Sequence, residues 1–368
     1  MQTLLKRRVV VLSGYGEFSR RVASGIAALP QAECVLGLPP GAHATTFAQR
    51  IGAPFMSLDP NEPSSLYRLL DGAFVVVNVR GPFAAREHLT IPAHCAAHGI
   101  HYIDPAESRD YFNEFMCLAR EAREHDAMLV TGAGAAPAVT SILAGLLTDY
   151  FDRVNEISVF LTPGLGDQRE LATARAVLAR ADQPMRIKDG GRWREQRWWE
   201  RPQSVTFPAP VGRRRGYLCD LPDLDLLGKH FSARTVTAHA GFAPGLLNMM
   251  LATLAAMRRR GWVERLSPFS AALIRIAARA TRAHANAAAV RVAMSGTRHG
   301  SEEEQHVAAL MARNGAGPAI AAAPILALVR RWAERGVKES GAQPCVGLLD
   351  FADLKRELVE HDVVLVRQ

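Results

Sequence analysis

The chain has 368 residues, of which 48% are hydrophobic and 22% are charged, a composition typical of a folded protein with a sizeable core. This composition excludes a disordered chain, and no apolar stretch approaches the roughly 20 residues that a membrane-spanning helix needs. The formal net charge of +8 comes mostly from arginine, with clusters at Arg213–Arg215 and Arg258–Arg260. Neither cluster belongs to a recognisable nucleic-acid motif, so we expect no nucleic-acid partner.

The first third of the chain alternates short β-rich runs with helical patterns. Strands are expected at 8–13, 33–38, 74–79, 101–103 and 127–130. Helices are expected at 19–29, 45–50, 64–70, 86–98 and 111–125. This alternation predicts an α/β fold with a parallel, doubly wound sheet that is covered on both faces.

The pattern changes after about Ala135 and predicts an inserted α+β second domain. The expected elements are a helix at 138–149, a strand at 154–162, a helix at 171–181, short antiparallel strands within 190–220, a strand leading into a helix over 234–257, a hairpin around 296–300 and a helix at 324–335. We expect a nucleotide-binding domain at 1–135, a substrate and dimerisation domain at 136–323, and C-terminal helices at 324–368 that pack back on the first domain.

Five cysteines are scattered along the chain and form no C-x-x-C pair: Cys34, Cys95, Cys117, Cys219 and Cys345. The opening "MQTLLKRRVVVL" leads directly into a strand pattern and contains no signal-type segment. These features predict free thiols and a cytoplasmic protein.

The stretch "VVVLSGYGEFSRRVASGI" is typical of a strand that turns at glycines into a helix. Gly14 allows the tight turn, and Gly16 allows a pyrophosphate to approach the N–H groups at the helix start. Ser19 stands where the dinucleotide fingerprint has its third glycine. We expect a dinucleotide to be bound here, and the alternative is a turn that only packs. The residues expected to contact the cofactor are Gly14, Tyr15, Gly16, Glu17, Phe18 and Ser19.

The end of the second expected strand, "CVLGLPPGAHA", lacks the residue that would distinguish NAD from NADP. An acid would bind the ribose hydroxyls of NAD there, and an arginine would meet the 2′-phosphate of NADP. Leu38 occupies this position, with His43 and Arg50 further away, so the sequence leaves NADP and NAD both open.

Several segments resemble the saccharopine dehydrogenase-like family: the glycine turn, "DGAFVVVNVRGPF", "PAHCAAHGIHYIDPAES", "LVTGAGAAPAVTSILA", and "AGPAIAAAPILAL" with "GAQPCVGLLD". The resemblance implies a Rossmann domain with an inserted α+β domain that closes the active-site cleft and often forms a homodimer interface. It also implies NAD(P)-dependent redox chemistry at a carbon bonded to nitrogen in an amino-acid or amine substrate. The chain departs from the family at Ser19, at Leu38 and in the alanine-rich "GAGAAP".

Residues just after the strands of a doubly wound sheet face the ligand. We therefore expect cofactor contacts from Asn78, Val79, Arg80, Gly81, Pro82 and Gly132, although "NVRGPF" is also compatible with a simple turn. Asp104 is a candidate catalytic carboxylate that could orient an amine or relay a proton. Its alternative role is to cap the next helix.

The second domain offers cations for a substrate carboxylate, because a guanidinium matches a carboxylate in a bidentate way. The candidates are Arg169, Arg175 and Arg215, and Tyr217 and His239 are further catalytic candidates with a structural role as the alternative. His94 and His98 share a helix face, but no carboxylate completes a ligand set, so no metal is expected.

Two other functions compete with the NAD(P)-dependent oxidoreductase. An aldehyde or semialdehyde dehydrogenase would need a nucleophilic cysteine near the crossover helix, and "GAGAAPAV" has none. A non-catalytic dinucleotide-binding sensor or interaction protein would suit the missing ribose acid.

Overall fold

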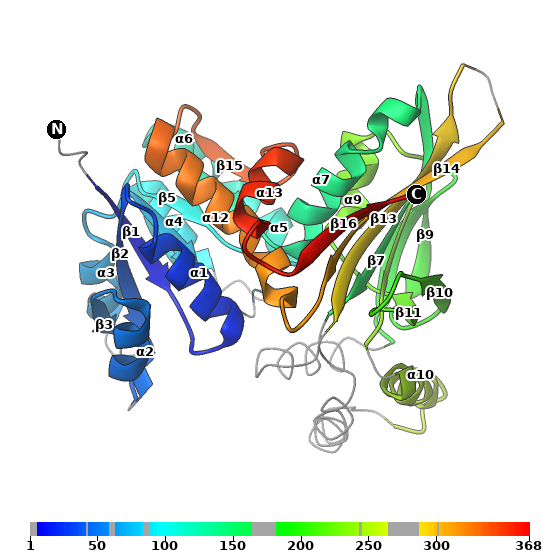
Figure 1. The fold of residues 1–368 in the computed structure, drawn as a ribbon, viewed down its shortest axis with the longest axis horizontal. Helices are drawn as coiled ribbons and strands as arrows, with labels where there is room; N and C mark the ends of the chain where they lie inside the picture. The colour runs from blue at the N-terminus through cyan, green and yellow to red at the C-terminus, as the bar shows by residue number, and fades with distance from the viewer. Residues whose placement is uncertain are drawn as a thin grey trace. The chain divides into compact units, whose positions relative to one another are not determined.

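The computed structural model describes residues 6–41, 43–58, 63–81, 83, 89–163, 182–242, 245–263, 287–299 and 302–368. The chain divides into two compact units (Figure 1). Unit 1 comprises residues 1–138 and 321–357, and unit 2 comprises residues 139–320 and 358–368. In the part of the chain that is described, no helix has both the length and the apolar character needed to cross a membrane.

Unit 1 is built on a parallel sheet that has seven strands among the described residues, in the order β15-β6-β5-β4-β1-β2-β3. The strands are β1 Arg7–Leu12, β2 Ala32–Leu38, β3 Phe55–Ser57, β4 Val75–Asn78, β5 His101–Ile103, β6 Met128–Thr131 and β15 Gly341–Pro344. Val9–Leu12 and Val75–Val77 are completely buried, as expected for strands that are covered by helices on both faces.

The helices of unit 1 follow the doubly wound plan. They are α1 Glu17–Ala27, α2 His43–Ile51, α3 Pro63–Leu70, α4 Thr90–Ala97, α5 Arg109–Phe115, α6 Ala119–Glu124, α12 Gly317–Arg335, whose first turn lies in unit 2, and α13 Phe351–Leu358. Connections after β1 run toward β2 and β3, whereas connections after β4 run toward β5 and β6. Right-handed crossovers then place the two sets of helices on opposite faces. The strand order reverses between β1 and β4, and ligands of such sheets bind at this point beyond the carboxyl ends of the strands.

Unit 2 contains a mixed sheet of nine described strands, with the main order β10-β11-β12-β7-β13-β14-β16, with β8 beside β12 and with β9 beside β8. The strands are β7 Arg153–Thr162, β8 Pro184–Asp189, β9 Arg192–Arg197, β10 Gln203–Thr206, β11 Arg213–Leu218, β12 Thr235–Ala240, β13 Ala288–Thr297, β14 Glu304–Ala312 and β16 Val363–Arg367. Its described α-helices are α7 Thr140–Gly145, α9 Asp223–His230 and α10 Gly245–Arg259.

The two faces of this sheet are distinguished by what packs on them. Helix α9 lies against Val236, because a Cβ on Gly228 would come within 3.2 Å of the Val236 side chain; this side is called the α9 face. On the opposite side, Phe160 forms a core cluster with Val205 and Phe207; this side is called the Phe160 face.

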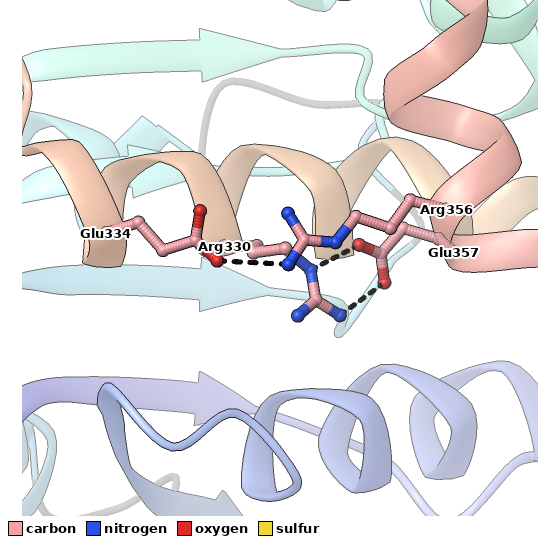
Figure 2. A network of polar contacts seen from close by, with 4 residues as sticks. All are labelled: Arg330, Glu334, Arg356 and Glu357. Atoms are coloured by element: carbon pink, nitrogen blue, oxygen red, sulfur yellow. Dashed lines mark hydrogen bonds and ion pairs between the residues drawn. The ribbon is translucent and has the colours of Figure 1, made fainter.

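The two C-terminal helices of unit 1 are joined by ion pairs (Figure 2). Arg330 on α12 binds Glu357 on α13 through both carboxylate oxygens, at 2.6 and 3.1 Å. Arg356 reaches Glu334 at 3.4 Å. Helix α12 in turn packs on α1, since a Cβ on Gly25 would lie 2.6 Å from Leu326.

The predicted α/β fold with a doubly wound parallel sheet and an inserted second unit is confirmed. The domain borders at 135 and 323 stay a prediction. The expected helix at 171–181 lies outside the described residues.

Several predicted elements were wrong in detail. The single helix expected at 111–125 is divided into α5, a 3-10 turn at Met116–Leu118 and α6. The helix expected at 138–149 is divided into α7 and a 3-10 turn at Thr148–Tyr150. A wide turn at Ala135–Val139, in which Ala136 is extended (φ −126°, ψ 131°), precedes α7. Helix α12 begins at Gly317, so Pro324 lies inside it instead of starting it.

Candidate functional site

The turn between β1 and α1 presents a helix N-terminus that no side chain caps. Gly16 is the N-cap residue, with an extended backbone (φ −73°, ψ 164°). The N–H groups and the dipole of a helix start favour an anion such as a pyrophosphate. The negative charge of Glu17 in the first turn is balanced by Arg20 at 2.6 Å and Arg21 at 3.0 Å.

The space beside Gly14 is open. A Cβ built on Gly14 would meet only the Ser19 hydroxyl oxygen, at 3.9 Å. Ser19 itself is buried on α1, as is Phe18, which fits a packing role for the residue at the third glycine position. The turn therefore leaves space beside Gly14 that no other described side chain fills.

The loop after β2 is linked to this turn through Tyr15. The Tyr15 hydroxyl donates to the carbonyl of Pro39 at 2.5 Å, and its ring contacts Phe47 edge-on with centroids 5.7 Å apart. Leu38 is completely buried, so its side chain is not available to a ribose. His43 and Arg50 are exposed on α2.

Asp104 lies at the carboxyl end of β5, and its side chain is completely buried. Its Oδ1 accepts hydrogen bonds from the Ala106 amide at 2.9 Å, the Thr131 hydroxyl at 2.7 Å and the Gly132 amide at 3.3 Å. Its Oδ2 accepts a hydrogen bond from the Tyr111 hydroxyl at 2.9 Å. Burial raises the pKa of the carboxyl group, while these four donors favour its charged form.

The alternative that Asp104 caps the next helix is not what the structure shows. Helix α5 has Ser108 as its N-cap, and the Ser108 hydroxyl accepts a hydrogen bond from the Tyr111 amide at 3.5 Å. Asp104 instead holds the loop after β5 to the loop after β6.

Asn78 ends β4 and is also buried. Its side-chain amide donates to the Tyr102 hydroxyl at 3.1 Å, and its Oδ1 accepts from the Arg80 amide at 3.2 Å. The side chain of Asn78 therefore shapes the turn that follows it.

The remaining residues of this loop differ in exposure. Val79 is buried, whereas Arg80 and Gly81 are exposed at the carboxyl edge. Pro82 lies outside the described residues. Of the expected contacts that the structure describes in this loop, the exposed residues Arg80 and Gly81 are therefore the ones that a ligand can reach.

Gly132 follows β6 and is enclosed by protein. It has a positive φ of 77°, and a Cβ there would lie 2.5 Å from the Phe112 ring and 2.6 Å from Pro137. This glycine is required for close packing of the loop after β6, in contrast to the open position of Gly14.

The two candidate catalytic residues in unit 2, Tyr217 and His239, lie on opposite faces of the sheet, as the strand register shows. Tyr217 is paired with Ala240, and His239 is paired with Leu218 on one side and Phe160 on the other. Directly paired residues share a face and successive residues alternate. Tyr217 therefore lies on the α9 face and His239 on the Phe160 face, so the structure does not bring these two side chains together.

Each of these residues has its own surroundings. Tyr217 stacks on Trp199 with ring centroids 5.4 Å apart, and the guanidinium of Arg215 lies 5.7 Å from the Tyr217 ring. The Nε2 of His239 is 3.2 Å from the Arg201 carbonyl, and burial lowers the pKa of His239 to about 4. Arg169 and Arg175 lie outside the described residues.

His94 and His98 stack on α4 with ring centroids 4.0 Å apart. The Nδ1 of His98 is bonded to the His94 carbonyl at 2.8 Å. No group of three or more potential metal ligands occurs within the described ranges.

Sequence reasoning did not identify Tyr102, Tyr111 or Thr131, which surround Asp104. The signal was partly available, because Tyr102 lies in β5 and Asp104 directly follows this strand, two residues later in the sequence. Tyr111 and Thr131 come from a helix and from another strand, and their approach to Asp104 depends on the tertiary fold.

Residues 10–130 match the family described as the saccharopine dehydrogenase NADP binding domain. This part of the chain is therefore similar to that domain family. The matched stretch includes the turn at Gly14–Gly16, the loop at Asn78–Gly81 and Asp104. Its cofactor class is NADP or NAD.

Solved structures with a similar fold include the apo saccharopine dehydrogenase (L-Glu forming) of Saccharomyces cerevisiae. It is 13% identical, with a TM-score of 0.72, over 98% of this chain and 99% of that chain. A mutant meso-dapdh from Clostridium tetani E88 with DAP is 11% identical, with a TM-score of 0.48, over 96% of this chain and 99% of that chain. A probable dehydrogenase from Thermotoga maritima is 8% identical, with a TM-score of 0.46, over 96% and 93%. No curated protein matches the sequence at a significant level.

Proposed function

We propose that the protein transfers hydride between NADP or NAD and a carbon bonded to nitrogen in a small amino-acid or amine substrate. The observation that carries this proposal is the carboxyl edge of unit 1. There, the uncapped start of α1 lies at the end of β1, next to β4 in the sheet, and one buried carboxylate ties the loops after β5 and β6 together.

The cofactor supplies the hydride chemistry, and the protein supplies binding and orientation. We assign the pyrophosphate to the N-terminus of α1 and to the open space at Gly14, with Tyr15, Gly16, Glu17, Phe18 and Ser19 forming the turn. The exposed backbone at Arg80–Gly81 would contact the nicotinamide half, with Val79 and Asn78 beneath it. Asp104 and Gly132 are enclosed by protein, so neither residue has room for a ligand beside it. They therefore shape this edge from inside.

In unit 2, Arg215 is the favoured substrate contact, and the buried Tyr217 supports it. They lie on the same face of the sheet, and the Tyr217 ring holds the exposed guanidinium of Arg215 in place. An oriented guanidinium can bind a substrate carboxylate in a bidentate way. His239 lies on the other face, and its low pKa makes it a neutral imidazole at pH 7, so we assign it a separate role from this pair.

Calorimetric titration with NADPH and NADH tests the first part of the proposal. We expect micromolar binding of at least one of them, and no binding of either would overturn the proposal. Oxidation of the bound cofactor would then be screened with pairs of an amino acid or amine and a 2-oxo acid or aldehyde. Turnover should require both members of a pair, because the imine forms from an amine and a carbonyl.

A non-catalytic dinucleotide-binding protein is the second candidate. It is favoured by the state of Asp104, which accepts four hydrogen bonds inside the protein and is completely buried. Tight binding of NADPH or NADH without turnover of any pair would support this alternative.

We further propose that unit 1 is the cofactor domain, that unit 2 is the substrate domain and that the protein forms a homodimer through unit 2. The dimer is implied by the family resemblance alone. Light scattering after size-exclusion chromatography would test it, and a mass of about 40.0 kDa would contradict it.

A further inference from the structure

One buried side-chain amide in unit 2 holds the strand that carries Arg215. Asn248 lies in the first turn of α10 and is 1% exposed. Its Oδ1 accepts a hydrogen bond from the Phe242 amide at 2.8 Å. Its Nδ2 donates to the Phe242 carbonyl at 2.7 Å and to the Arg215 carbonyl at 3.0 Å. Because the nitrogen can only donate and the oxygen can only accept, these three partners fix the orientation of the amide.

The Asn248 amide takes the place of a bonded residue pair between β11 and β12. Alternate pairs of an antiparallel ladder exchange backbone hydrogen bonds, and the Cys219 amide donates to the Ala238 carbonyl at 2.9 Å. In the same register Arg215 and Phe242 would form such a pair, but the pairing of the two strands ends one bonded pair earlier. The Asn248 side chain is bonded to both residues instead, so it determines how the backbone of Arg215 lies where the strands separate.

Arg215 also stands at the end of a row of stacked rings. Phe242 stacks on Trp199 with ring centroids 6.0 Å apart, and Trp199 stacks on Tyr217 with centroids 5.4 Å apart. The Arg215 guanidinium lies 5.7 Å from the Tyr217 ring, within the range of a cation–π contact. The Trp199 Nε1 donates to the Asn248 backbone carbonyl at 3.1 Å. Asn248 is therefore bonded to the two residues that end the row, Phe242 and Arg215, and to its central ring.

The rings of this row are buried, whereas the guanidinium at its end is accessible. Trp199, Tyr217 and Phe242 are at most 5% exposed, and Arg215 is exposed. Bidentate binding of a carboxylate needs a guanidinium in a defined plane. An arginine whose backbone is fixed and whose guanidinium lies over a ring loses less conformational freedom when it binds a ligand.

We propose that Asn248 is a positioning residue for a substrate carboxylate, which acts by holding the backbone of Arg215 at the end of the row of rings. This inference rests on the proposed function, because Arg215 is the substrate contact assigned there. It gives α10 a part in substrate recognition through a side chain that does not itself touch the substrate.

A double-variant cycle tests whether Asn248 acts through Arg215. The variants are Asn248→Ala, Arg215→Ala and the combination of both. Leu227→Ala is the matched control, because Leu227 is completely buried on α9 of the same unit. KM and kcat would be measured with NADPH or NADH for the carboxylate-bearing member of the pair that turns over best, and for its carboxamide counterpart. Melting temperatures would report the effect of each variant on stability.

Arg215→Ala should raise the KM for the carboxylate by about thirtyfold, the factor for a lost hydrogen bond to a charged group. Asn248→Ala should raise it by about tenfold, with kcat within about threefold of the wild type. The double variant should match Arg215→Ala within about threefold, because Asn248 has no effect once the guanidinium is gone. The KM for the carboxamide should change by less than about threefold in all of these variants.

Two further variants separate positioning from stability. Leu227→Ala should lower the melting temperature through the cavity that it leaves without changing the KM for the carboxylate or the carboxamide. Asn248→Ser has a hydroxyl that donates one hydrogen bond where the amide donates two. It should raise the KM for the carboxylate less than Asn248→Ala does, and it replaces Asn248→Ala in the cycle if that variant does not fold.

Each outcome decides the matter in one direction. A rise in the carboxylate KM that disappears in the Arg215→Ala background supports the inference. An equal rise in both backgrounds, or an equal rise for the carboxamide, overturns the inference while the proposed function stands. Turnover of amine–aldehyde pairs alone, with no carboxylate substrate, also overturns only the inference. A wild type that turns over no pair overturns the proposed function, and the inference with it.

Discussion

Gly14 and Gly132 occupy similar places in the sequence, each just after a strand of unit 1, but they meet different surroundings. A Cβ on Gly14 would meet only Ser19 at 3.9 Å, whereas one on Gly132 would overlap Phe112 at 2.5 Å with the backbone at φ 77°. Gly14→Ala should leave the free energy of unfolding within about 0.5 kcal/mol of the wild type and should weaken NADPH binding, because the methyl group enters the pyrophosphate space. Gly132→Ala should cost about 2–4 kcal/mol through overpacking and backbone strain.

Urea denaturation and calorimetric titration of both variants would check this pair of expectations. A Gly14→Ala protein with unchanged affinity would place the pyrophosphate elsewhere. Equal destabilisation by both variants would mean that the space beside Gly14 is filled.

His101 is a second residue whose surroundings give a testable result. Its Nδ1 accepts the amide of Met128 at 3.0 Å, and burial together with the nearby charge of Arg7 lowers its pKa to about 4. Because the unfolded chain has the ordinary pKa of 6.5, it takes up the proton first. The stability that neutral His101 contributes is therefore present above about pH 6.5 and is lost as the pH falls toward 4.

The variant His101→Asn keeps an acceptor near the position of Nδ1 and cannot be protonated in this range. Thermal unfolding between pH 7.5 and pH 4 should show a smaller decrease in melting temperature for His101→Asn than for the wild type. Parallel decreases in the two proteins would show that other groups cause the acid sensitivity.

At the scale of the elements, the joint between α12 and α13 depends on a largely buried ion pair (Figure 2). The Glu357 side chain is 6% exposed and that of its partner Arg330 is 23% exposed. Glu357→Ala leaves Arg330 without its partner in a half-buried position and should cost about 2–4 kcal/mol. The matched control is Glu334→Ala, because Glu334 pairs with Arg356, which is 59% exposed, and an exposed pair contributes about 0–1 kcal/mol. Equal losses in urea denaturation would contradict this ranking.

The helices and strands also show which parts of the fold can be predicted from the sequence. Buried apolar runs such as Val9–Leu12 predicted the central strands correctly, because a parallel sheet that is covered on both faces demands them. The break at Met116–Leu118 carries no glycine or proline, so local propensity gave no reason to end a helix there. The short strand Phe55–Ser57 is exposed throughout and lacks the alternation that marks a strand.

The site was predictable to a similar degree. The turn at Gly14 and Gly16 and the loop at Asn78 follow strands whose pattern is clear, so their place at the carboxyl edge could be predicted. The partners of Asp104 could not, because Thr131 and Tyr111 reach it from other elements. The opposite orientations of Tyr217 and His239 depend on strand register, which the sequence alone does not determine.

At the scale of the whole molecule, the chain passes between the two units at residues 138–139, 320–321 and 357–358. The second passage lies within helix α12, which begins in unit 2 and continues in unit 1. An uninterrupted helical pattern gives no local sign of such a border. Each unit is therefore completed by a segment from the C-terminal part of the chain.

The last segment gives a prediction that separates the two units. Strand β16 pairs with β14 at the edge of the unit 2 sheet, Gln368 and Val307 exchange backbone hydrogen bonds of 2.7 and 3.0 Å, and Val366 packs on the cluster around Phe160. Deleting residues 359–368 should destabilise unit 2 by about 2–4 kcal/mol, the sum of several cross-strand pairs, while the affinity for NADPH stays the same because the proposed cofactor loops belong to unit 1.

A point variant separates the loss of packing from the loss of the strand. Val366→Ala should reproduce part of the destabilisation, about 1 kcal/mol, whereas Val359→Ala should have no effect because Val359 is 76% exposed. Urea denaturation and calorimetric titration of the three variants would check these expectations. If the deletion weakens NADPH binding as strongly as it lowers stability, the two units do not act separately, and the cofactor site depends on the edge of the unit 2 sheet.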